Sequence, residues 1–280
     1  MRIALAQLEL SAEPQENLGA VKDVIVRAAD AGADLVVFPE ATMKAFNTGR
    51  LDTVAEPLDG PFATAVRSAA AEAGVTVVLG MFRPADVVER DGKELQRVHN
   101  TLLATGPDVD AHYDKIRLFD AFGFRESDTV APGDELVVID VPVGDAEVRR
   151  TVRVGLATCF DIRFPESARI PTLHGARILM NPGAFNMTTG PAHWELLLRQ
   201  RAVDNQCFTV GTSPARDESA SYVAWGNSMV CDPWGTVLHQ CGTGEELVVT
   251  ELELSRVSAI RRQLPILSAR RTDIYEISEK

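Results

Sequence analysis

Apolar residues recur along the chain with two spacings, which predict strands separated by helices. Short runs of alternating or continuous apolar positions predict strands over residues 2–8, 34–40 and 75–82. Between them, apolar positions three or four residues apart predict helices over 17–31 and 61–74. The second of these strands is apolar almost throughout, as in strands that are covered on both faces. The pattern is typical of an α/β fold.

The same pattern continues through the rest of the chain. Further strands are predicted at 98–105, at 111–115, 135–143, 152–158, 177–185, 207–216, 227–231, 235–240 and 245–254. Further helices are predicted at 166–174, from about 191 to 206, and at 255–265. Polar or Pro-Gly-bearing segments such as 84–94 and 232–235 are typical of hairpin turns, so the sheet is expected to be mixed. With no linker or low-complexity run, residues 1–280 are predicted to form a single α/β domain.

Composition and charge exclude several classes of protein. The 280 residues are 45% hydrophobic and 24% charged, which is ordinary for a globular protein. The formal net charge of −12 gives the chain no general attraction to nucleic acid or to anionic lipid. No apolar run approaches the ~20 residues of a membrane span. We therefore expect no nucleic-acid or membrane partner.

The N-terminus and the cysteines indicate the compartment. The first ten residues, MRIALAQLEL, lack the long apolar core of a signal peptide. The cysteines are widely spaced and form no CxxC pair, and they are Cys159, Cys207, Cys231 and Cys241. This spacing is not typical of a disulfide framework or a zinc site. We expect a cytoplasmic protein with reduced thiols.

One stretch, VRVGLATCFDIRFPE at 152–166, joins a predicted strand to a predicted helix. The alternation of the strand stops at Cys159, and Pro165 suits the first turn of a helix because its fixed φ is already helical. A thiol at such an elbow lies near helical N–H groups, which favour the thiolate and can receive an oxyanion. The alternative is that Cys159 is a buried apolar filler, since free cysteine is often buried.

Two other strand ends carry charged residues. Glu40 follows the apolar run DLVVFP, Lys115 ends another strand, and Glu126 lies in the loop that follows. Each could be an ordinary surface residue when it is taken alone. Sites in α/β folds, however, assemble at strand ends. Beside the thiol of Cys159, these residues supply a carboxylate that can take its proton and a cation that can stabilise an oxyanion. Such a set of groups is sufficient for nucleophilic catalysis without a histidine.

These segments resemble a known family. FPE ending at Glu40, YDKIRLFD around Lys115 and CFDIRFPE from Cys159 are similar to the three signature segments of the nitrilase, or carbon–nitrogen hydrolase, superfamily. The similarity extends over essentially the whole chain. Within the superfamily the chain is most similar to the omega-amidase branch. That finer similarity is carried by NPGAFNMTTGPAHWELLLRQRAVDNQ, SPARDESASYVAWGNSMVCDPWG and IRRQLPILSARRTDIY.

The resemblance implies a fold and a set of catalytic roles. The fold would be a four-layer α-β-β-α sandwich with two mixed sheets. Cys159 would be the nucleophile and Glu40 the general base. Lys115 and the backbone N–H of Phe160 would stabilise the oxyanion, and Glu126 would position Glu40 or the substrate. No metal or organic cofactor is implied.

The branch also implies a substrate class. The reaction would be hydrolysis of the terminal amide of small 2-oxo dicarboxylic acid monoamides, such as 2-oxoglutaramate and 2-oxosuccinamate, through a cysteine thioester. Arg163 is the candidate for binding the substrate carboxylate, because a guanidinium binds carboxylate in a bidentate manner. An ion pair with Asp161 or Glu166 is the alternative. Phe185 and Thr189 lie in the loop that would line the pocket, although packing roles are equally compatible.

Other functions stay open at this stage. A related enzyme could act on deaminated glutathione, an N-carbamoyl compound or a nitrile. A cysteine–histidine hydrolase would need a base from among His99, His112, His174, His193 and His239. A non-catalytic binding protein could keep the same fold. Members of the superfamily commonly form homodimers or larger homo-oligomers, so the resemblance places the C-terminal tail, about 265–280, at a dimer interface.

Overall fold

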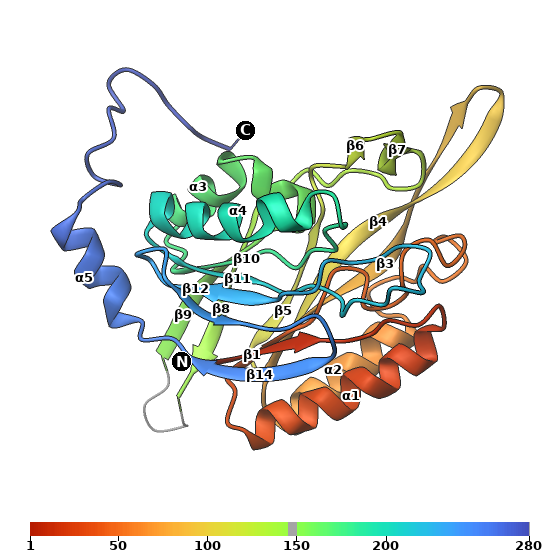
Figure 1. The fold of residues 1–280 in the computed structure, drawn as a ribbon, viewed down its shortest axis with the longest axis horizontal. Helices are drawn as coiled ribbons and strands as arrows, with labels where there is room; N and C mark the ends of the chain where they lie inside the picture. Colours follow the sequence, from red (N-terminus) through yellow and green to blue (C-terminus); the bar gives the residue numbers. More distant parts are fainter. Residues whose placement is uncertain (145–149, 280) are drawn as a thin grey trace.

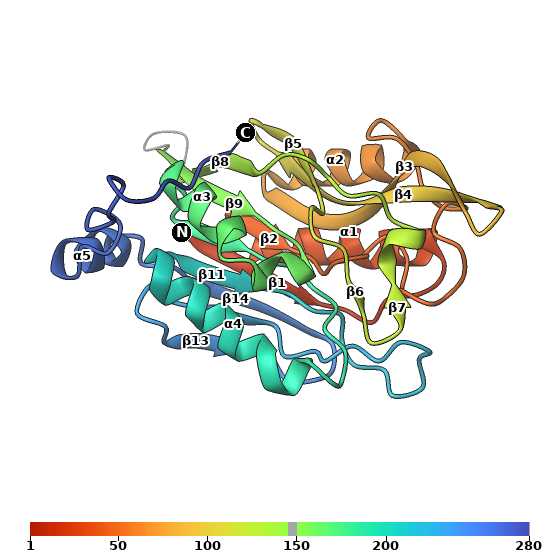
Figure 2. The same cartoon turned by 90° about the horizontal axis from the view of Figure 1, so that it is seen from above.

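Two β-sheets lie face to face, with helices on both outer surfaces, in the computed structural model of the protein (Figure 1). The structure describes residues 1–144 and 150–279. Figure 1 shows α1 and α2 on one side of the sheets and α3 and α4 on the other, and in Figure 2, which is turned by 90°, α3 and α4 lie in front. The layers are therefore helix, sheet, sheet and helix, and the predicted four-layer α-β-β-α fold is confirmed.

Within the described residues, each of the two large sheets has six strands. The first sheet runs β14 (Glu246–Glu251), β1 (Arg2–Gln7), β2 (Leu35–Val37), β3 (Thr76–Arg90), β4 (Lys93–Gly106) and β5 (Val109–Asp114). The second runs β13 (Val237–Gln240), β12 (Met229–Cys231), β11 (Phe208–Gly211), β10 (Ile178–Met180), β9 (Arg150–Leu156) and β8 (Val137–Val143). In each sheet the central strands pair in parallel and the outer strands pair antiparallel, so both sheets are mixed, as the turns predicted. A small ribbon joins β6 (Asp120–Ala121) to β7 (Phe124–Arg125).

The outer faces are covered by α1 (Pro14–Asp30), α2 (Pro61–Ala73), α3 (Glu166–Leu173) and α4 (Gly190–Asn205). Helix α5 (Ser255–Gln263) lies beside the sandwich (Figure 1), and two 3₁₀ turns are η1 (Glu126–Asp128) and η2 (Cys159–Arg163). Helix α1 starts three residues before the predicted range because Pro14 is pre-shaped for a first turn. Its predicted apolar positions Leu18, Val21, Ile25 and Ala28 are all buried. No helix in the described ranges is long and apolar enough to cross a membrane.

The period of two along each strand divides the core into layers. Ile3 and Leu5 of β1 point between the sheets, where they join Val154 and Leu156 of β9 in one buried cluster. Ala4 and Ala6 of the same strand point outward beneath α1 and α2, in a second cluster. Burial of both faces explains why the strand sequences are apolar almost throughout. It also fixes the register, since a slip by one residue would exchange the two faces.

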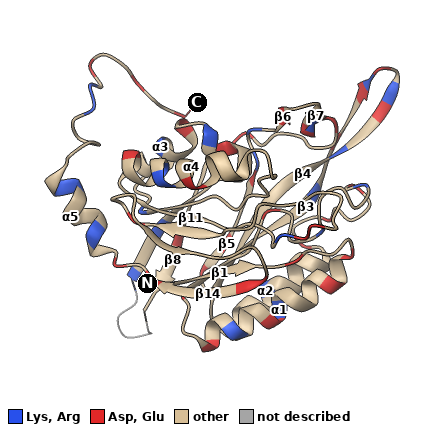
Figure 3. Ribbon diagram, in the orientation of Figure 1, with Lys and Arg blue, Asp and Glu red and all other residues tan. Residues whose placement is uncertain are grey.

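The hairpin between β3 and β4 is longer than predicted. The polar segment 84–94 was expected to be a connection, but β3 continues to Arg90 and β4 begins at Lys93. Only Asp91 and Gly92 form the turn, both with positive φ, as a two-residue hairpin loop requires. The extension protrudes from the body of the protein (Figure 1). Hydrogen bonds between the two strands hold it as strand although many of its side chains are charged (Figure 3).

Candidate functional site

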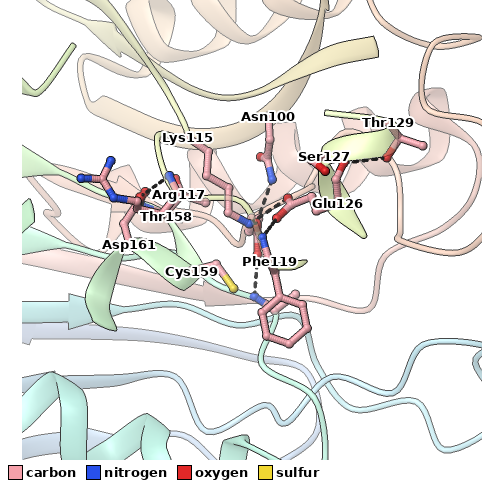
Figure 4. A network of polar contacts seen from close by, with 12 residues as sticks. Asn100, Lys115, Arg117, Phe119, Glu126, Ser127, Thr129, Thr158, Cys159 and Asp161 are labelled. Carbon is pink, nitrogen blue, oxygen red and sulfur yellow. Dashed lines mark hydrogen bonds and ion pairs between the residues drawn. The ribbon is translucent and has the colours of Figure 1, made fainter. Parts of the chain in front are cut away.

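Three strands from two sheets deliver the predicted residues to one place. The chain leaves β2 through Phe38 and Pro39 to reach Glu40, and Lys115 directly follows β5. Cys159 comes three residues after β9, at the start of η2. Figure 4 shows the side chains of Lys115, Glu126 and Cys159 converging, with Asn100 above them. Segments far apart along the chain thus meet where the two sheets face each other.

Buried ion pairs form the centre of the site. The Nζ of Lys115 lies 2.9 Å from Oε1 of Glu40 and 2.8 Å from Oε1 of Glu126. The three side chains are almost wholly buried, and buried charges need partners of this kind. Burial by itself would lower the pKa of Lys115, but the charges of Glu126 and Glu40 outweigh it and raise that pKa well above its ordinary value. Lys115 is therefore a fixed cation.

Both oxygens of Glu40 are held by further donors. Asn100 Nδ2 donates to Oε1 at 2.8 Å, and the backbone N–H of Ala184 donates to Oε2 at 2.9 Å. Asn100 was missed by the sequence analysis. Its signal was a polar amide within the apolar run VHNTLLAT, where burial requires a hydrogen-bond partner.

Close backbone contact places Glu40 against the neighbouring strand. A Cβ on Gly80 of β3 would lie 2.4 Å from the backbone nitrogen of Ala41, so only glycine fits there. Ala41 itself adopts a positive φ of 59°. This turn directs Glu40 toward Lys115 instead of letting it continue the sheet.

Glu126 is held from the other side of the lysine. It is the first residue of η1, and its Oε2 accepts the backbone N–H of Phe119 at 2.6 Å. The carboxylate therefore ties the loop after β5 to the buried cation. This loop also carries Phe119 against Phe160, whose ring centroids lie 5.2 Å apart.

A tight turn sets the position of Cys159. Its φ is +47°, unusual for a non-glycine residue, and its N–H donates to the carbonyl of Pro182 at 2.8 Å. A Cβ on Gly183 would lie 3.0 Å from the Cα of Cys159, which is tighter than most Cβ contacts, so glycine eases this close approach. The thiol lies close enough to Glu40 for the charge of that carboxylate to raise the pKa of Cys159. Phe160 is the next residue of η2, and the first N–H groups of a helical turn have no acceptor within the turn.

The protonation state of the thiol differs from the sequence-based expectation. Burial raises the pKa of Cys159 well above its ordinary value, and the charge of Glu40 raises it further, while Lys115 acts in the opposite direction. The predicted low-pKa thiolate is thus wrong for the resting site. The thiol keeps its proton, and Glu40 is the adjacent group that can accept it.

A buried carboxylate braces the elbow. Asp161 accepts hydrogen bonds from Tyr113 Oη at 2.6 Å, from the Thr158 N–H at 2.9 Å and from the Arg117 N–H at 2.9 Å. With Thr158 it forms a capping box at the start of η2. Burial raises the pKa of Asp161 to about 6, against the hydrogen bond from Tyr113. Asp161 is therefore a brace for the turn, a role that the sequence analysis did not identify.

Arg163 has no carboxylate partner among the described residues. Its guanidinium lies 5.0 Å from the ring centroid of Phe185 and 5.6 Å from that of Phe160. Its Nη1 is 3.2 Å from His193 Nδ1, and its Nε is buried without a hydrogen-bond partner. The alternative ion pairs with Asp161 and Glu166 are thus not formed. Arg163 is a half-buried cation beside Cys159 whose charge is not neutralised by the neighbouring side chains.

Phe185 and Thr189 lie in different surroundings. Phe185 is buried, with its ring centroid 5.0 Å from that of Trp194, and one face is turned to Arg163. The hydroxyl of Thr189 donates to Asn186 Oδ1 at 3.0 Å, directly before α4. Phe185 therefore borders the site, whereas the hydroxyl of Thr189 is used in its own turn.

A pocket of about 380 Å³ lies next to Glu40. Ala41, Ala184 and Tyr222 contribute to its wall. The hydroxyl of Tyr222 donates to the carbonyl of Ala184, the same peptide segment whose N–H binds Glu40. Tyr222 was also missed by the sequence analysis, where nothing distinguished it from an ordinary loop tyrosine.

No histidine in the described ranges is hydrogen-bonded to Cys159. His193 contacts Arg163 instead. His99 and His239 lie beside other carboxylates, at 3.9 Å from Asp114 and 3.7 Å from Glu246. This arrangement argues against a cysteine–histidine pair.

A four-layer sandwich of this topology, with a glutamate, a lysine and a cysteine joined at the ends of its strands, defines the class of nitrilase-fold hydrolases. Comparison with known proteins agrees. The Carbon-nitrogen hydrolase family matches residues 2–262. The chain belongs to the carbon–nitrogen hydrolase family, which confirms the resemblance seen in its three segments.

Individual relatives span the whole chain. Omega-amidase NIT2 of Bos taurus is 41% identical over 286 residues, covering 100% of this chain and 98% of that protein. Omega-amidase NIT2 of Danio rerio is 40% identical over 284 residues, covering 99% and 97%. Among solved structures, Saccharomyces cerevisiae Nit3, a member of branch 10 of the nitrilase superfamily, superimposes with a TM-score of 0.82 at 31% identity, covering 97% of this chain and 96% of that one.

Proposed function

We propose that the protein is an omega-amidase. It hydrolyses the terminal amide of small 2-oxo dicarboxylic acid monoamides, such as 2-oxoglutaramate and 2-oxosuccinamate, to the dicarboxylic acid and ammonia. The full-length similarity to proteins named omega-amidase supports this reaction. The observation that carries the chemistry is the convergence of Cys159 and Lys115 on one buried carboxylate, Glu40.

The proposed mechanism has two half-reactions, and Glu40 transfers the proton in both. Glu40 takes the proton of Cys159, and the sulfur attacks the amide carbon. Lys115 and the N–H of Phe160 stabilise the oxyanion, and such a donor contributes about 3–4 kcal/mol in other hydrolases. Glu40 then gives the proton to the departing ammonia, which leaves a thioester. Water attacks the thioester with Glu40 again as base, and the thiol is restored as the acid leaves.

Glu126 has a positioning role in this proposal. It shares Lys115 with Glu40, so it fixes the ammonium between two carboxylates. The lysine is then held in place before substrate arrives, and preorganised charge is what makes electrostatic stabilisation effective in a buried site. Phe185 borders the space next to Cys159 and limits the width of the acyl group, while Thr189 supports the loop that carries Phe185.

Arg163 is the proposed partner of the substrate's free carboxylate. It is half-buried near Cys159, it is stacked on Phe160 and Phe185, and no carboxylate of the described residues neutralises it. A carboxylate at the far end of a short substrate would satisfy its unpaired N–H groups. A guanidinium held by two rings has few orientations, so it also selects the length of the substrate.

Replacing Arg163 by alanine is expected to raise KM for 2-oxoglutaramate by about 10- to 100-fold, the cost of one charge-assisted pair. The kcat should change much less, because Arg163 does not contact the reacting bond in this proposal. Steady-state kinetics on 2-oxoglutaramate and on a neutral amide of equal length test this. Equal losses on the two substrates would indicate that Arg163 is only structural.

Product release across a substrate panel tests the proposed reaction, with ammonia measured for every substrate except deaminated glutathione, whose amide hydrolysis releases cysteinylglycine instead. The panel holds 2-oxoglutaramate, 2-oxosuccinamate, deaminated glutathione, an N-carbamoyl amino acid and the nitrile of 2-oxoglutaric acid, with Cys159→Ala protein as the blank. We expect the highest kcat/KM on the two 2-oxo monoamides. A higher value on the nitrile, or on deaminated glutathione, would reject the omega-amidase proposal while leaving the cysteine chemistry intact.

We also propose that the chain forms a homodimer or a larger homo-oligomer in the cytoplasm. An apolar groove of about 420 Å³ lies between α4 and the turn before β13, and Leu196 and Trp234 in it are 61% and 60% exposed. Helix α4 follows the nucleophile segment, and the exposed tail carries further apolar side chains. A second copy packed on this face would bury them. The thiols of all four cysteines are unpaired, as suits a reducing compartment.

Trp234→Glu is expected to weaken self-association by about 30-fold or more, the effect of removing an aromatic interface anchor. Light scattering after size exclusion would show a shift toward monomer at micromolar concentration. Val26→Glu is the matched control, because Val26 is 54% exposed on α1, on the opposite outer layer. Equal behaviour of the two variants would contradict an interface at α4.

A further inference from the structure

A second cluster of chemically active side chains lies at the junction of the two sheets. His239, Cys241 and Glu246 stand at the end of β13, in the following turn and at the start of β14. One nitrogen, one sulfur and one carboxylate oxygen of these residues all lie within 4.8 Å of one another. The chain passes from one sheet to the other between them (Figure 2).

We propose that His239, Cys241 and Glu246 bind one divalent transition-metal ion, of which Zn²⁺ is the best match. Imidazole nitrogen, thiolate sulfur and carboxylate oxygen are the three ligand types of protein zinc sites. A fourth position would be filled by water, because His239 and Glu246 are partly exposed. The site is independent of the reaction proposed above.

The unsatisfied ring nitrogen of His239 indicates a missing ligand. Nε2 of His239 is buried without a hydrogen-bond partner, although Glu246 Oε1 is only 3.7 Å away. That distance is too long for a hydrogen bond. It is close to the roughly 3.3–3.6 Å that separates two ligand atoms on a tetrahedral zinc with bonds of ~2.0–2.3 Å. An ion between the two atoms would satisfy both.

The surrounding backbone holds the other two ligands. His239 and Cys241 are two residues apart at the end of a strand, so their side chains lie on one face. The N–H of Gly242 donates to Glu246 Oε2 at 3.0 Å, which leaves Oε1 turned to the histidine. Gln7 Nε2 donates to the carbonyls of Gly242 and Gly244, at 2.8 and 2.6 Å, and braces the turn. To bind one ion, the ligand atoms would have to move about 1 Å closer together. Rotation of the partly exposed side chains of His239 and Glu246 allows this.

The cysteine spacing along the chain gave no sign of this site. Its signature, H-x-C-x₄-E, mixes ligand types and depends on β13 and β14 meeting through a short turn. When the metal–sulfur bond forms, Cys241 releases its proton to solvent, because the thiolate is the ligand. The bound ion would then link the edges of both sheets.

Titration with Co²⁺, followed by competition with Zn²⁺, tests the proposal. The experiment uses full-length Cys159→Ala protein, so that the thiol of the amidase site cannot bind the metal. We expect one Co²⁺ per chain, thiolate-to-cobalt absorption in the near ultraviolet, and loss of that absorption when Zn²⁺ is added. In the same background, His239→Asn should weaken binding more than about 100-fold. Replacing a residue that only hydrogen-bonds to a metal ligand lowers metal affinity by up to about 100-fold, so a larger loss marks a direct ligand. Cys241→Ser should abolish the near-ultraviolet absorption.

Two control variants keep the outcome clear. His174→Asn and Cys231→Ser replace the same residue types outside the cluster and should leave binding unchanged. The partial exposure of His239 makes its variant safe for folding even if Cys241→Ser is unstable. Absence of 1:1 binding, or binding that survives His239→Asn unchanged, would overturn the site without affecting the amidase proposal.

Discussion

Cys159→Ala protein is expected to lose at least about 10⁴-fold in kcat, since removal of a nucleophile leaves only binding and electrostatic stabilisation. The fold should be unchanged, because the substitution removes a single sulfur atom and adds no bulk or charge. Ammonia release from 2-oxoglutaramate measures the loss, and far-ultraviolet circular dichroism measures the fold.

Mass spectrometry distinguishes a lost nucleophile from a disturbed site. Wild-type protein mixed with substrate and quenched in acid should carry the acyl group as a thioester on the peptide that contains Cys159. Cys159→Ala protein should carry none. Cys231→Ala is the matched control, because its buried thiol has no carboxylate–lysine pair beside it, and it should retain the adduct. An adduct on any other cysteine would refute the assigned nucleophile.

Lys115→Met protein is expected to lose both activity and stability. The methionine keeps most of the side-chain volume but leaves Glu40 and Glu126 buried without their cation. Breaking a buried ion pair costs about 3–5 kcal/mol in the free energy of unfolding. The kcat should fall about 10²- to 10³-fold, as when one oxyanion donor is removed. Urea unfolding and steady-state kinetics measure the two effects.

A double variant separates the two roles of Lys115. Adding Glu126→Gln removes one unpaired charge, so Lys115→Met/Glu126→Gln should regain part of the stability but no activity. Arg27→Met is the surface control. Its ion pair with Asp23 is well exposed, and its loss should cost less than about 1 kcal/mol. Recovery of activity in the double variant would show that Lys115 acts only by neutralising carboxylates.

Some features of the site were readable from local sequence and others were not. The elbow at Cys159 was predicted because a strand pattern stops there and Pro165 follows, and both effects are local. The protonation of the thiol was predicted wrongly. It depends on burial and on Glu40, which lies 119 positions earlier and meets Cys159 only after folding. Asn100, Asp161 and Tyr222 were missed as site residues for the same reason.

The hairpin of β3 and β4 shows the same limit at the level of secondary structure. The segment 84–94 is polar, and polarity favours a loop when only neighbours along the chain are considered. Pairing across the hairpin stabilises it as strand instead, because strand hydrogen bonds are made between segments and not within one. Helices, whose hydrogen bonds are local, were placed more closely, as at α3 and α5.

The sequence pattern by itself determined the α/β class and three strand ends that carry an acid, a cation and a thiol, whereas the four layers were implied only by the resemblance to the family. Periodicity encodes these features because each side chain's burial follows from its neighbours a few positions away. Only the tertiary structure decided that Lys115 lies between two glutamates, that Arg163 has no carboxylate partner within residues 1–144 and 150–279, and that His239 faces Glu246. The interaction between two charges depends on their separation in space. That separation cannot be read from the number of residues between them along the chain.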